Sequence, residues 1–412
     1  MKNPFSPAIP VLPEDFIGRS SEISLAFDRI LQRSSIAIWG SPGIGKSSFL
    51  KFLAAPTSWE EYGYDLSKVV VIHFSCLEIP VFTASDFWRT ILKSTIEAPN
   101  CGLQVKSEVT KILQKSLETT SSDLRLILGL LKKENKFLVV LADDYDVALQ
   151  PNSRYSKEDI VSFLHRSRSL AVHSIEGGQL SMIVTSLYRL TDLLRSNENM
   201  SPWYNHYLFL TLRPFNEEEA LGLMNLGNIS QTLKELLIKI SGKNPALLQI
   251  AGSLALNNIE NGELNIKCFV EEFRSAAHEL LRFTWVVLSK TEKHLLVLIA
   301  LSRWKPHFHK RIKSRDLDII FSQMHREVND LEVRGILEPD PKDDWNRKTR
   351  YHFASAAMEY WVLHEFIVNG RDDISSLDVG ASYNVLLQEV RWLKKDIVPP
   401  IDIWITQVLA SS

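Results

Sequence analysis

A glycine-rich segment separates an apolar run from a helical pattern at residues 39–50, WGSPGIGKSSFL. Residues 35–39 are short and almost wholly apolar, as expected of a strand buried on both faces of a parallel sheet. The segment matches the pattern G-x-x-x-x-G-K-[ST], in which glycines let backbone N–H groups close around phosphate oxygens at a helix N-terminus. An accidental glycine-rich turn is the alternative, but it leaves the flanking strand and helix unexplained. The sequence therefore predicts a phosphate-binding loop.

The side chains of this loop have separate expected roles. We expect Lys46 to reach the β- and γ-phosphates of ATP, and the Ser47 hydroxyl to ligate Mg²⁺. ATP or ADP with Mg²⁺ are thus the expected cofactors. The predicted nucleotide-binding residues of the loop and first helical turn are Ser41, Pro42, Gly43, Ile44, Gly45, Lys46, Ser47 and Ser48.

A second apolar run, KFLVVLADDYD at residues 136–146, ends in adjacent carboxylates. Asp143 is expected to hold Mg²⁺ through water, and Asp144 to polarise the water that attacks the terminal phosphate. Asp146 is interpreted as a solvated or capping acid. An ordinary strand that ends in an acidic turn is the alternative reading. The preceding phosphate-binding loop favours the metal-orienting role.

Three further runs predict the remaining strands of an α/β sheet. Residues 180–186 end in Thr185-Ser186. In P-loop proteins with an additional strand between the strand of the loop and the acidic strand, a polar residue such as Thr185 at this position senses the γ-phosphate. Residues 68–75 and 207–212 complete a five-stranded parallel sheet of the P-loop NTPase type, and residues 83–98 and 121–135 read as connecting helices.

Other motifs flank this core in a fixed order. Residues 16–31, FIGRSSEISLAFDRIL, place a Gly-Arg pair before a helix, and residues 209–220, FLTLRPFNEEEA, lead from the last strand into an acidic helix. Residues 240–255, ISGKNPALLQIAGSLA, contain a Gly-x-Pro motif. This order resembles the AAA+ and STAND ATPases, the latter being nucleotide switches for signalling that include the NB-ARC and archaeal-type ATPases.

The resemblance implies further nucleotide contacts. Gly18 and Arg19, and Pro245 of the Gly-x-Pro motif, would close over the base and phosphates of the nucleotide. Origin-recognition AAA+ proteins place an arginine where this chain has Pro245, a departure that favours a switch. The arginine that often follows the Thr-Ser strand end is displaced to Arg189, which leaves its role open.

The last third of the chain has the order of a winged helix. Residues 289–302 predict a buried helix capped by Ser289 with Glu292 three residues on. Residues 321–340 contain a second, amphipathic helix that is expected to end at Gly335. Residues 336–355 read as two strands joined by a charged loop. The expected domains are 1–215 (ATPase core), 216–280 (helical lid), 281–370 (winged helix) and 371–412 (a helical segment, with the start of a longer region as the alternative).

The charges of the winged helix bear on DNA binding. Residues 303–315 hold six Lys or Arg, but residues 281–360 as a whole carry 15 basic and 11 acidic side chains. A helix that enters a major groove should bring few carboxylates to the phosphates. The expected recognition helix carries Arg326, Arg334, Glu327, Asp330 and Glu332.

Composition sets the broad class. The formal net charge is -2, so any nucleic-acid surface must be local. Three separated cysteines (Cys76, Cys101 and Cys268) argue against a zinc site or a disulfide framework, and no apolar run is long enough to span a membrane. We expect a cytoplasmic protein of two or three domains without a membrane partner.

Two functions are weighed. The leading hypothesis is an ATP-hydrolysing STAND/AAA+ switch that forms homo-oligomers in the ATP state and signals to a partner protein or effector. The alternative is an AAA+ ATPase that assembles on duplex DNA through its winged helix. A small-molecule P-loop kinase is disfavoured because no lid of clustered arginines follows the core.

Overall fold

The computed structural model describes residues 3–115, 118–193, 203–260, 262, 265–303, 323–339 and 351–365. The chain forms two compact units. The core unit comprises Pro10–Gly40 and Gly45–Leu212, and the lid unit comprises Met1–Ile9, Ser41–Ile44 and Arg213–Ser412. The expected four-part division of the chain remains a prediction, and its last part, 371–412, lies outside the described residues.

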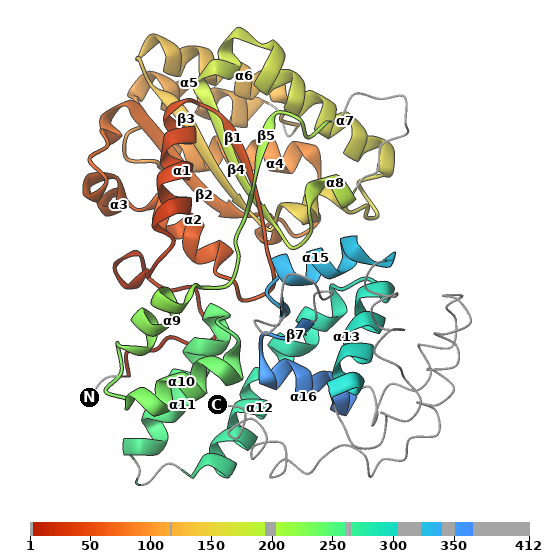
Figure 1. Cartoon of the computed structure of the whole chain (residues 1–412). Helices are drawn as coiled ribbons and strands as arrows, with labels where there is room; N and C mark the ends of the chain where they lie inside the picture. Colours follow the sequence, from red (N-terminus) through yellow and green to blue (C-terminus); the bar gives the residue numbers. More distant parts are fainter. Residues whose placement is uncertain are drawn as a thin grey trace, which may run out of the picture. The chain divides into compact units, whose positions relative to one another are not determined.

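The core unit contains the five-stranded parallel sheet that the sequence predicts (Figure 1). Its order is β2-β3-β4-β1-β5, so the strand of the phosphate-binding loop, β1, lies between β4 and β5. The strands are β1 (Ser35–Trp39), β2 (Val69–Ser75), β3 (Phe137–Asp143), β4 (Leu180–Ser186) and β5 (Tyr207–Thr211). β1, β3 and β4 are buried along their whole length, as expected of central strands in a parallel sheet.

Helices connect these strands, since parallel neighbours need crossovers. Alternate residues of the strands, such as Val70, Ile72 and Phe74 on β2, join one apolar cluster with the helices after β2 and β3. The helices are α1 (Ser20–Leu31), α2 (Lys46–Ala54), α3 (Pro56–Glu61), α4 (Ala84–Glu97), α5 (Leu103–Lys115), α6 (Ser121–Lys133), α7 (Lys157–Arg168) and α8 (Leu190–Leu193).

Short helical turns lie in the core unit's loops. The turn η5 continues α7 as a π-helix, and the others are 3₁₀ turns. They are η1 (Pro13–Asp15), η2 (Leu66–Lys68), η3 (Cys76–Glu78), η4 (Tyr145–Leu149), η5 (Ser169–His173) and η6 (Ile175–Gln179).

The lid unit is mainly helical. Its elements are α9 (Glu217–Met224), α10 (Gln231–Ser241), α11 (Pro245–Glu260), α12 (Ile266–Val286), α13 (Lys290–Arg303), α15 (His325–Val333), β6 (Leu337–Pro339), β7 (Tyr351–Phe353) and α16 (Ala356–His364). β6 and β7 pair antiparallel, which gives the helix, helix, hairpin order of a winged helix.

The predicted cap before α13 is present. The backbone N–H of Ser289 donates to Glu292 at 2.7 Å, and the backbone N–H of Glu292 donates to the Ser289 hydroxyl at 3.2 Å. This reciprocal pair satisfies two N–H groups that would otherwise lack helical partners. In the region of the helix predicted from residue 321, α15 begins at His325, and residues 321 and 322 lie outside the described residues.

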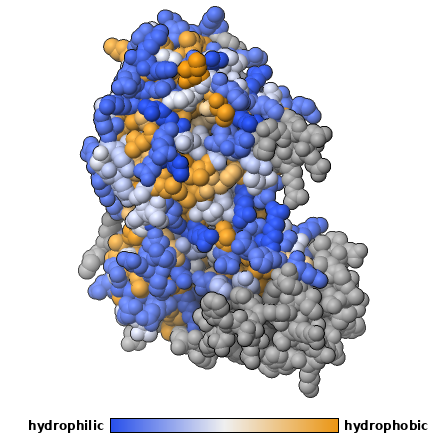
Figure 2. Space-filling view, turned by 45° about the horizontal axis from the view of Figure 1, so that its top comes forward, coloured by the Kyte–Doolittle hydropathy of each residue, from blue (hydrophilic) through white to orange (hydrophobic). Residues whose placement is uncertain are grey.

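The surface is mixed in polarity. Figure 2 shows hydrophobic areas interspersed with hydrophilic ones on the face in view. Exposed large hydrophobic side chains come from many separate elements, among them Leu12 before α1, Leu103 on α5 and Phe209 on β5. Among the described helices, none is long and apolar enough to cross a membrane.

Candidate active site

The candidate site lies at the carboxyl edge of the core unit's sheet. β2 and β3 pair in a register that sets Ser75 beside Asp143, and β1 pairs with β4 so that Trp39 stands beside Ser186. Because the strands are parallel, their last residues reach one edge, where β1 also runs into the phosphate-binding loop. In doubly wound α/β sheets this edge is where ligands bind.

Asp143 is held by a hydroxyl. It is 5% exposed, and the buried Thr185 hydroxyl donates a hydrogen bond to its Oδ1. The backbone N–H of Asp144 approaches both Asp143 Oδ1 and Thr185 Oγ1 at 3.2 Å. Thr185 therefore orients the predicted metal-binding carboxylate; its sensing of the γ-phosphate stays a prediction.

Asp144 leaves the strand in a left-handed conformation, with φ of 52°. Aspartate tolerates this region better than most residues because its short side chain bonds locally. The Ser75 hydroxyl donates to Asp144 Oδ2 at 2.7 Å. Burial raises the pKa of Asp144 and the negative charge of Asp143 adds to this, while the Ser75 hydrogen bond and Lys46 oppose it.

Sequence reasoning missed Ser75. Its only sequence signal is a polar residue at the end of an apolar strand, and that signal gains meaning when β2 is known to neighbour β3.

The second half of the phosphate-binding loop starts α2. Gly45 precedes the helix with φ of 99°, and a Cβ there would have no atom within 4 Å. The conformation itself, rather than crowding, therefore selects glycine. Lys46 Nζ donates to the Gly40 carbonyl at 2.8 Å, and its charge also lowers the pKa of Asp144. The predicted phosphate-binding cation and the predicted base thus interact electrostatically.

Ser47 and Ser48 begin the same helix but differ in their surroundings. Ser48 Oγ accepts a hydrogen bond from the backbone N–H of Val11 at 3.2 Å. Nearby, the Phe16 ring lies 4.9 Å from that of Phe52 on α2. The Ser48 hydroxyl therefore secures the segment before α1, and its expected contact with nucleotide stays a prediction, as does that of Ser47.

The first half of the loop, Ser41–Ile44, belongs to the lid unit. The Ser41 hydroxyl donates to the Arg334 carbonyl at 2.8 Å, and the backbone N–H of Ala246 donates to the Gly43 carbonyl at 3.1 Å. Gly43 has φ of 72°, and a Cβ there would lie 2.8 Å from Ala246 Cβ. Glycine is required here on both conformational and steric grounds.

Asn244 joins this half of the loop to α11. Its Nδ2 donates to the Pro42 carbonyl at 3.2 Å, while its Oδ1 accepts from the backbone N–H groups of Ala246 at 3.1 Å and Leu247 at 3.2 Å. Asn244 thus caps the helix and binds the loop. Sequence reasoning singled out the following residue, Pro245, which occupies the first position of α11, where proline fits well.

The Gly-Arg pair introduces α1. Gly18 and Arg19 both have positive φ, 72° and 65°, so the chain turns sharply before Ser20. The Arg19 side chain is 3% exposed and pairs with Glu22 at 3.4 Å. The role of both residues toward nucleotide remains a prediction.

Arg189 and Asp146 also lie near this edge of the sheet. The Arg189 guanidinium lies 4.5 Å from the centroid of the Trp39 ring, a cation–π contact within the core unit. Asp146 was expected to be a solvated or a capping acid, and the solvated reading is wrong: it is 7% exposed, and burial raises its pKa. It turns inward because it lies in the buried η4 turn rather than in an open loop.

The donor set fits Mg²⁺. A serine hydroxyl and carboxylate oxygens are hard ligands, and Mg²⁺ is usually held by one or two carboxylates together with phosphates and water. No group of three or more His, Cys, Asp or Glu in the described part of the chain could hold a metal by itself. Ser47 and Asp143 would therefore hold the ion only in company with nucleotide phosphates.

No protein-family model matches the sequence, and no curated protein matches it. Among solved structures, the Walker-type ATPase PABY2304 of Pyrococcus abyssi is similar with a TM-score of 0.54 at 15% identity, over 87% of this chain and 99% of that one. The ORC2 protein of Aeropyrum pernix, solved in ADPNP–ADP complexes, gives 0.53 at 16% identity, over 100% and 99%. The chain therefore has the fold of an AAA+ P-loop ATPase, with a helical lid and a winged helix after the α/β core.

Proposed function

We propose that this protein is a Mg²⁺-dependent ATPase. The observation that carries the proposal is the group at the carboxyl edge: Asp143 held by Thr185, and Asp144 held by Ser75, with the Lys46 charge acting on Asp144. A structural acidic turn needs none of these partners. The fold supports the proposal because it is that of Walker-type ATPases.

Each residue has a distinct task in this proposal. Lys46 pairs with the β- and γ-phosphates, and Ser47 and Asp143 hold the metal, which when bound neutralises phosphate charge. Asp144 accepts a hydrogen bond from the attacking water. The raised pKa of Asp144 makes it a stronger base than an exposed aspartate.

The test separates binding from hydrolysis. Lys46→Ala should weaken ATP binding severely because a bound polyphosphate loses its charge partner. Asp144→Asn should bind ATP as the wild type does and hydrolyse it about a hundredfold or more slowly. Lys51→Ala, an exposed lysine on the same helix, is the matched control. Wild-type ATP affinity in Lys46→Ala, or wild-type hydrolysis in Asp144→Asn, would overturn the assignment.

We also propose that the nucleotide state controls assembly on duplex DNA, the alternative considered from the sequence. Similarity to an ORC2 protein over the whole chain supports it, because origin-recognition proteins are the DNA-loading relatives that the motifs resemble. The basic segment 303–315, of which residues 304–315 lie outside the described residues, supplies the charge. Signalling to a protein effector is the second candidate, favoured by Pro245 in place of the arginine of origin-recognition proteins.

The described part of the winged helix restricts where DNA would bind. Arg334, just after α15, is 9% exposed, and its Nε lies 3.9 Å from Glu292. Its carbonyl also accepts the Ser41 hydroxyl. Arg334 is therefore unavailable to phosphates, which leaves the exposed Arg326 on α15 and the basic segments 303–315 and 342–350 as the candidates for DNA contacts.

Size measurements with and without duplex DNA test this second proposal. The wild-type protein should bind duplex DNA more tightly with ATP than with ADP and form a larger complex. ATP-dependent assembly without DNA affinity would instead favour the signalling switch.

A further inference from the structure

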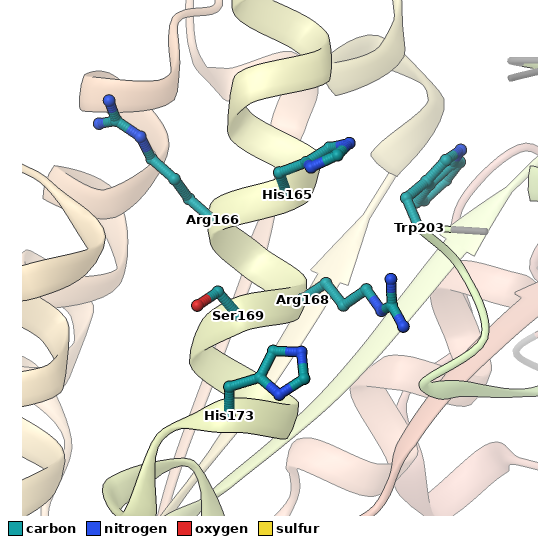
Figure 3. A pocket seen from close by; sticks show the side chains of 6 residues that line it. All are labelled: His165, Arg166, Arg168, Ser169, His173 and Trp203. Atoms are coloured by element: carbon teal, nitrogen blue, oxygen red, sulfur yellow. The ribbon is translucent and has the colours of Figure 1, made fainter. Parts of the chain in front are cut away.

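A polar cavity of about 360 Å³ lies in the core unit, away from the candidate active site (Figure 3). Its lining comes from the end of α7, from η5 and from the segment before β5: His165, Arg166, Arg168, Ser169, His173 and Trp203. η5 precedes the start of β4 and Trp203 precedes the start of β5. The cavity therefore lies toward the amino ends of the strands, about 23 Å, the length of a seven-residue strand, from the edge that carries Asp143.

The lining consists of hydrogen-bond donors and cations. Among the described residues it contains two arginines, two histidines, a serine hydroxyl and an indole N–H, and no carboxylate. Figure 3 shows the side chains of His165, Arg168 and His173 on the same side of the helix as Trp203, whereas Arg166 and Ser169 point the other way. Arginine and tryptophan side chains donate hydrogen bonds and cannot accept them. Such a surface is complementary to an anion.

Two of these donors are buried without a partner. Trp203 is 4% exposed, and its Nε1 has no hydrogen-bond partner among the described residues. Arg168 Nε is also buried and has no hydrogen-bond partner among the described residues. A buried donor without a partner is unfavourable, so such groups usually meet a partner that is not part of the chain. A ligand oxygen in the cavity would be such a partner.

The lowered pKa of the neighbouring His206 is consistent with a positive charge on Arg168 that no anion among the described residues offsets. Burial lowers its pKa to about 4, and the charge of Arg168 contributes to this. An anion beside Arg168 would reduce the repulsion. The guanidinium suits phosphate oxygens, because its planar set of N–H groups can bind two of them at once.

We propose that this cavity binds a small phosphorylated molecule. Arg168 is the charge partner of the phosphate, and the ring N–H groups of Trp203 and His165 donate hydrogen bonds to it. The volume is within the range of small-ligand pockets and exceeds what a lone phosphate ion needs. The remaining space accommodates the group that carries the phosphate. This site is independent of the proposed ATPase activity.

The test uses the full chain with Lys46→Ala, so that the phosphate-binding loop does not contribute. Inorganic phosphate and ribose 5-phosphate are titrated separately while the indole N–H signal of Trp203 is followed by NMR and assigned with Trp203→Phe. We expect saturable shifts, with ribose 5-phosphate binding more tightly than phosphate. Because the Trp203 signal reports on the cavity alone, the result does not depend on whether the loop binds ATP.

Variants locate the binding. Arg168→Gln should weaken ribose 5-phosphate at least tenfold, since a charge-assisted hydrogen bond contributes about 1.5–3 kcal/mol. Trp203→Phe, which keeps an aromatic ring in place, should weaken it severalfold as measured by calorimetry. Arg154→Gln removes an exposed arginine outside the cavity and should have no effect. No saturation at millimolar ligand, unchanged binding in Arg168→Gln, or equal affinity for phosphate and ribose 5-phosphate would overturn the proposal.

Discussion

Ser75 and Thr185 each donate a hydroxyl hydrogen bond to a neighbouring carboxylate, Asp144 and Asp143 respectively. A carboxylate that must orient a water or a metal loses effectiveness when its side chain is free to rotate. These two hydroxyls reduce that freedom at the ends of two strands.

Removing one hydroxyl tests this positioning role. Ser75→Ala should lower kcat for ATP hydrolysis about fivefold, the equivalent of one hydrogen bond of about 1 kcal/mol, and leave ATP affinity unchanged. Ser75→Thr, which keeps the hydroxyl, should retain most of the activity. Steady-state rates and equilibrium binding check both variants; a Ser75→Ala enzyme with normal kcat would show that Asp144 does not need this partner.

His206 makes stability depend on pH. Its pKa is about 4 in the folded protein and about 6.5 when unfolded, so below pH 6.5 the unfolded chain takes up a proton that the folded chain refuses. The contribution of His206 to the free energy of unfolding is fully present above pH 6.5 and declines as pH falls toward 4, with a loss of about 2 kcal/mol at pH 5.

Urea unfolding of wild type and His206→Phe at pH 7 and pH 5 measures this loss. The phenylalanine variant should lose less stability between the two values, because its ring does not titrate. Equal losses would mean that His206 is protonated as easily in the folded protein as in the unfolded chain.

For single residues, the sequence predicts those whose spacing defines a motif and misses those that act through tertiary neighbours. Lys46 and Asp143 follow from a loop pattern and a strand end. Ser75 and Asn244 could not be found, because each acts on a residue distant in sequence: Ser75 on Asp144 and Asn244 on Pro42.

Among the elements, α11 is joined to the phosphate-binding loop by a residue that also starts it. Asn244→Ala should lower the free energy of unfolding by about 2 kcal/mol, since it removes a helix cap worth about 1 and a hydrogen bond to Pro42 worth about 1. Asn244→Ser keeps a capping oxygen and should lose only about half as much. Denaturant unfolding of the two variants compares the two contributions. Equal losses would show that the cap adds nothing, and no loss in Asn244→Ser would show that the Pro42 bond adds nothing.

Four of the five strands agree with their predicted ranges to within one residue, because a buried parallel strand is a continuous apolar run between polar ends. β3 ends at Asp143, three residues before the end of the run 136–146. Their order could not be read from local pattern, because neighbours in the sheet are not neighbours in the sequence. α5 (Leu103–Lys115) was not predicted; only two of its residues, Val105 and Val109, are fully buried, which leaves a weak periodic signal.

For the whole molecule, the charge of residues 303–315 tests whether the partner is duplex DNA or a protein effector. Reversing Lys310, Arg311 and Lys313 to Glu should remove most of the duplex affinity and reduce the salt slope of log affinity by about three, since each phosphate contact contributes about 0.9. Fluorescence anisotropy at several salt concentrations measures both quantities.

A matched reversal distinguishes a local site from general charge. Exposed lysines on α5 and α6 (Lys111, Lys115 and Lys133), changed to Glu together, alter the net charge equally and should leave DNA binding nearly intact. ATP hydrolysis should survive both reversals, because exposed charges contribute little to folding. Equal loss in the two triple variants would indicate nonspecific attraction.

The chain passes between the core unit and the lid unit four times, after Ile9, Gly40, Ile44 and Leu212. A gene fragment that encodes only residues 10–212 would therefore contain the loop tip Ser41–Ile44 without Asn244, Ala246 and Arg334, the residues that bond it. The complementary fragment would lack that tip altogether. Neither unit is encoded by one uninterrupted stretch of the gene, so recombination at any single breakpoint would divide at least one of them.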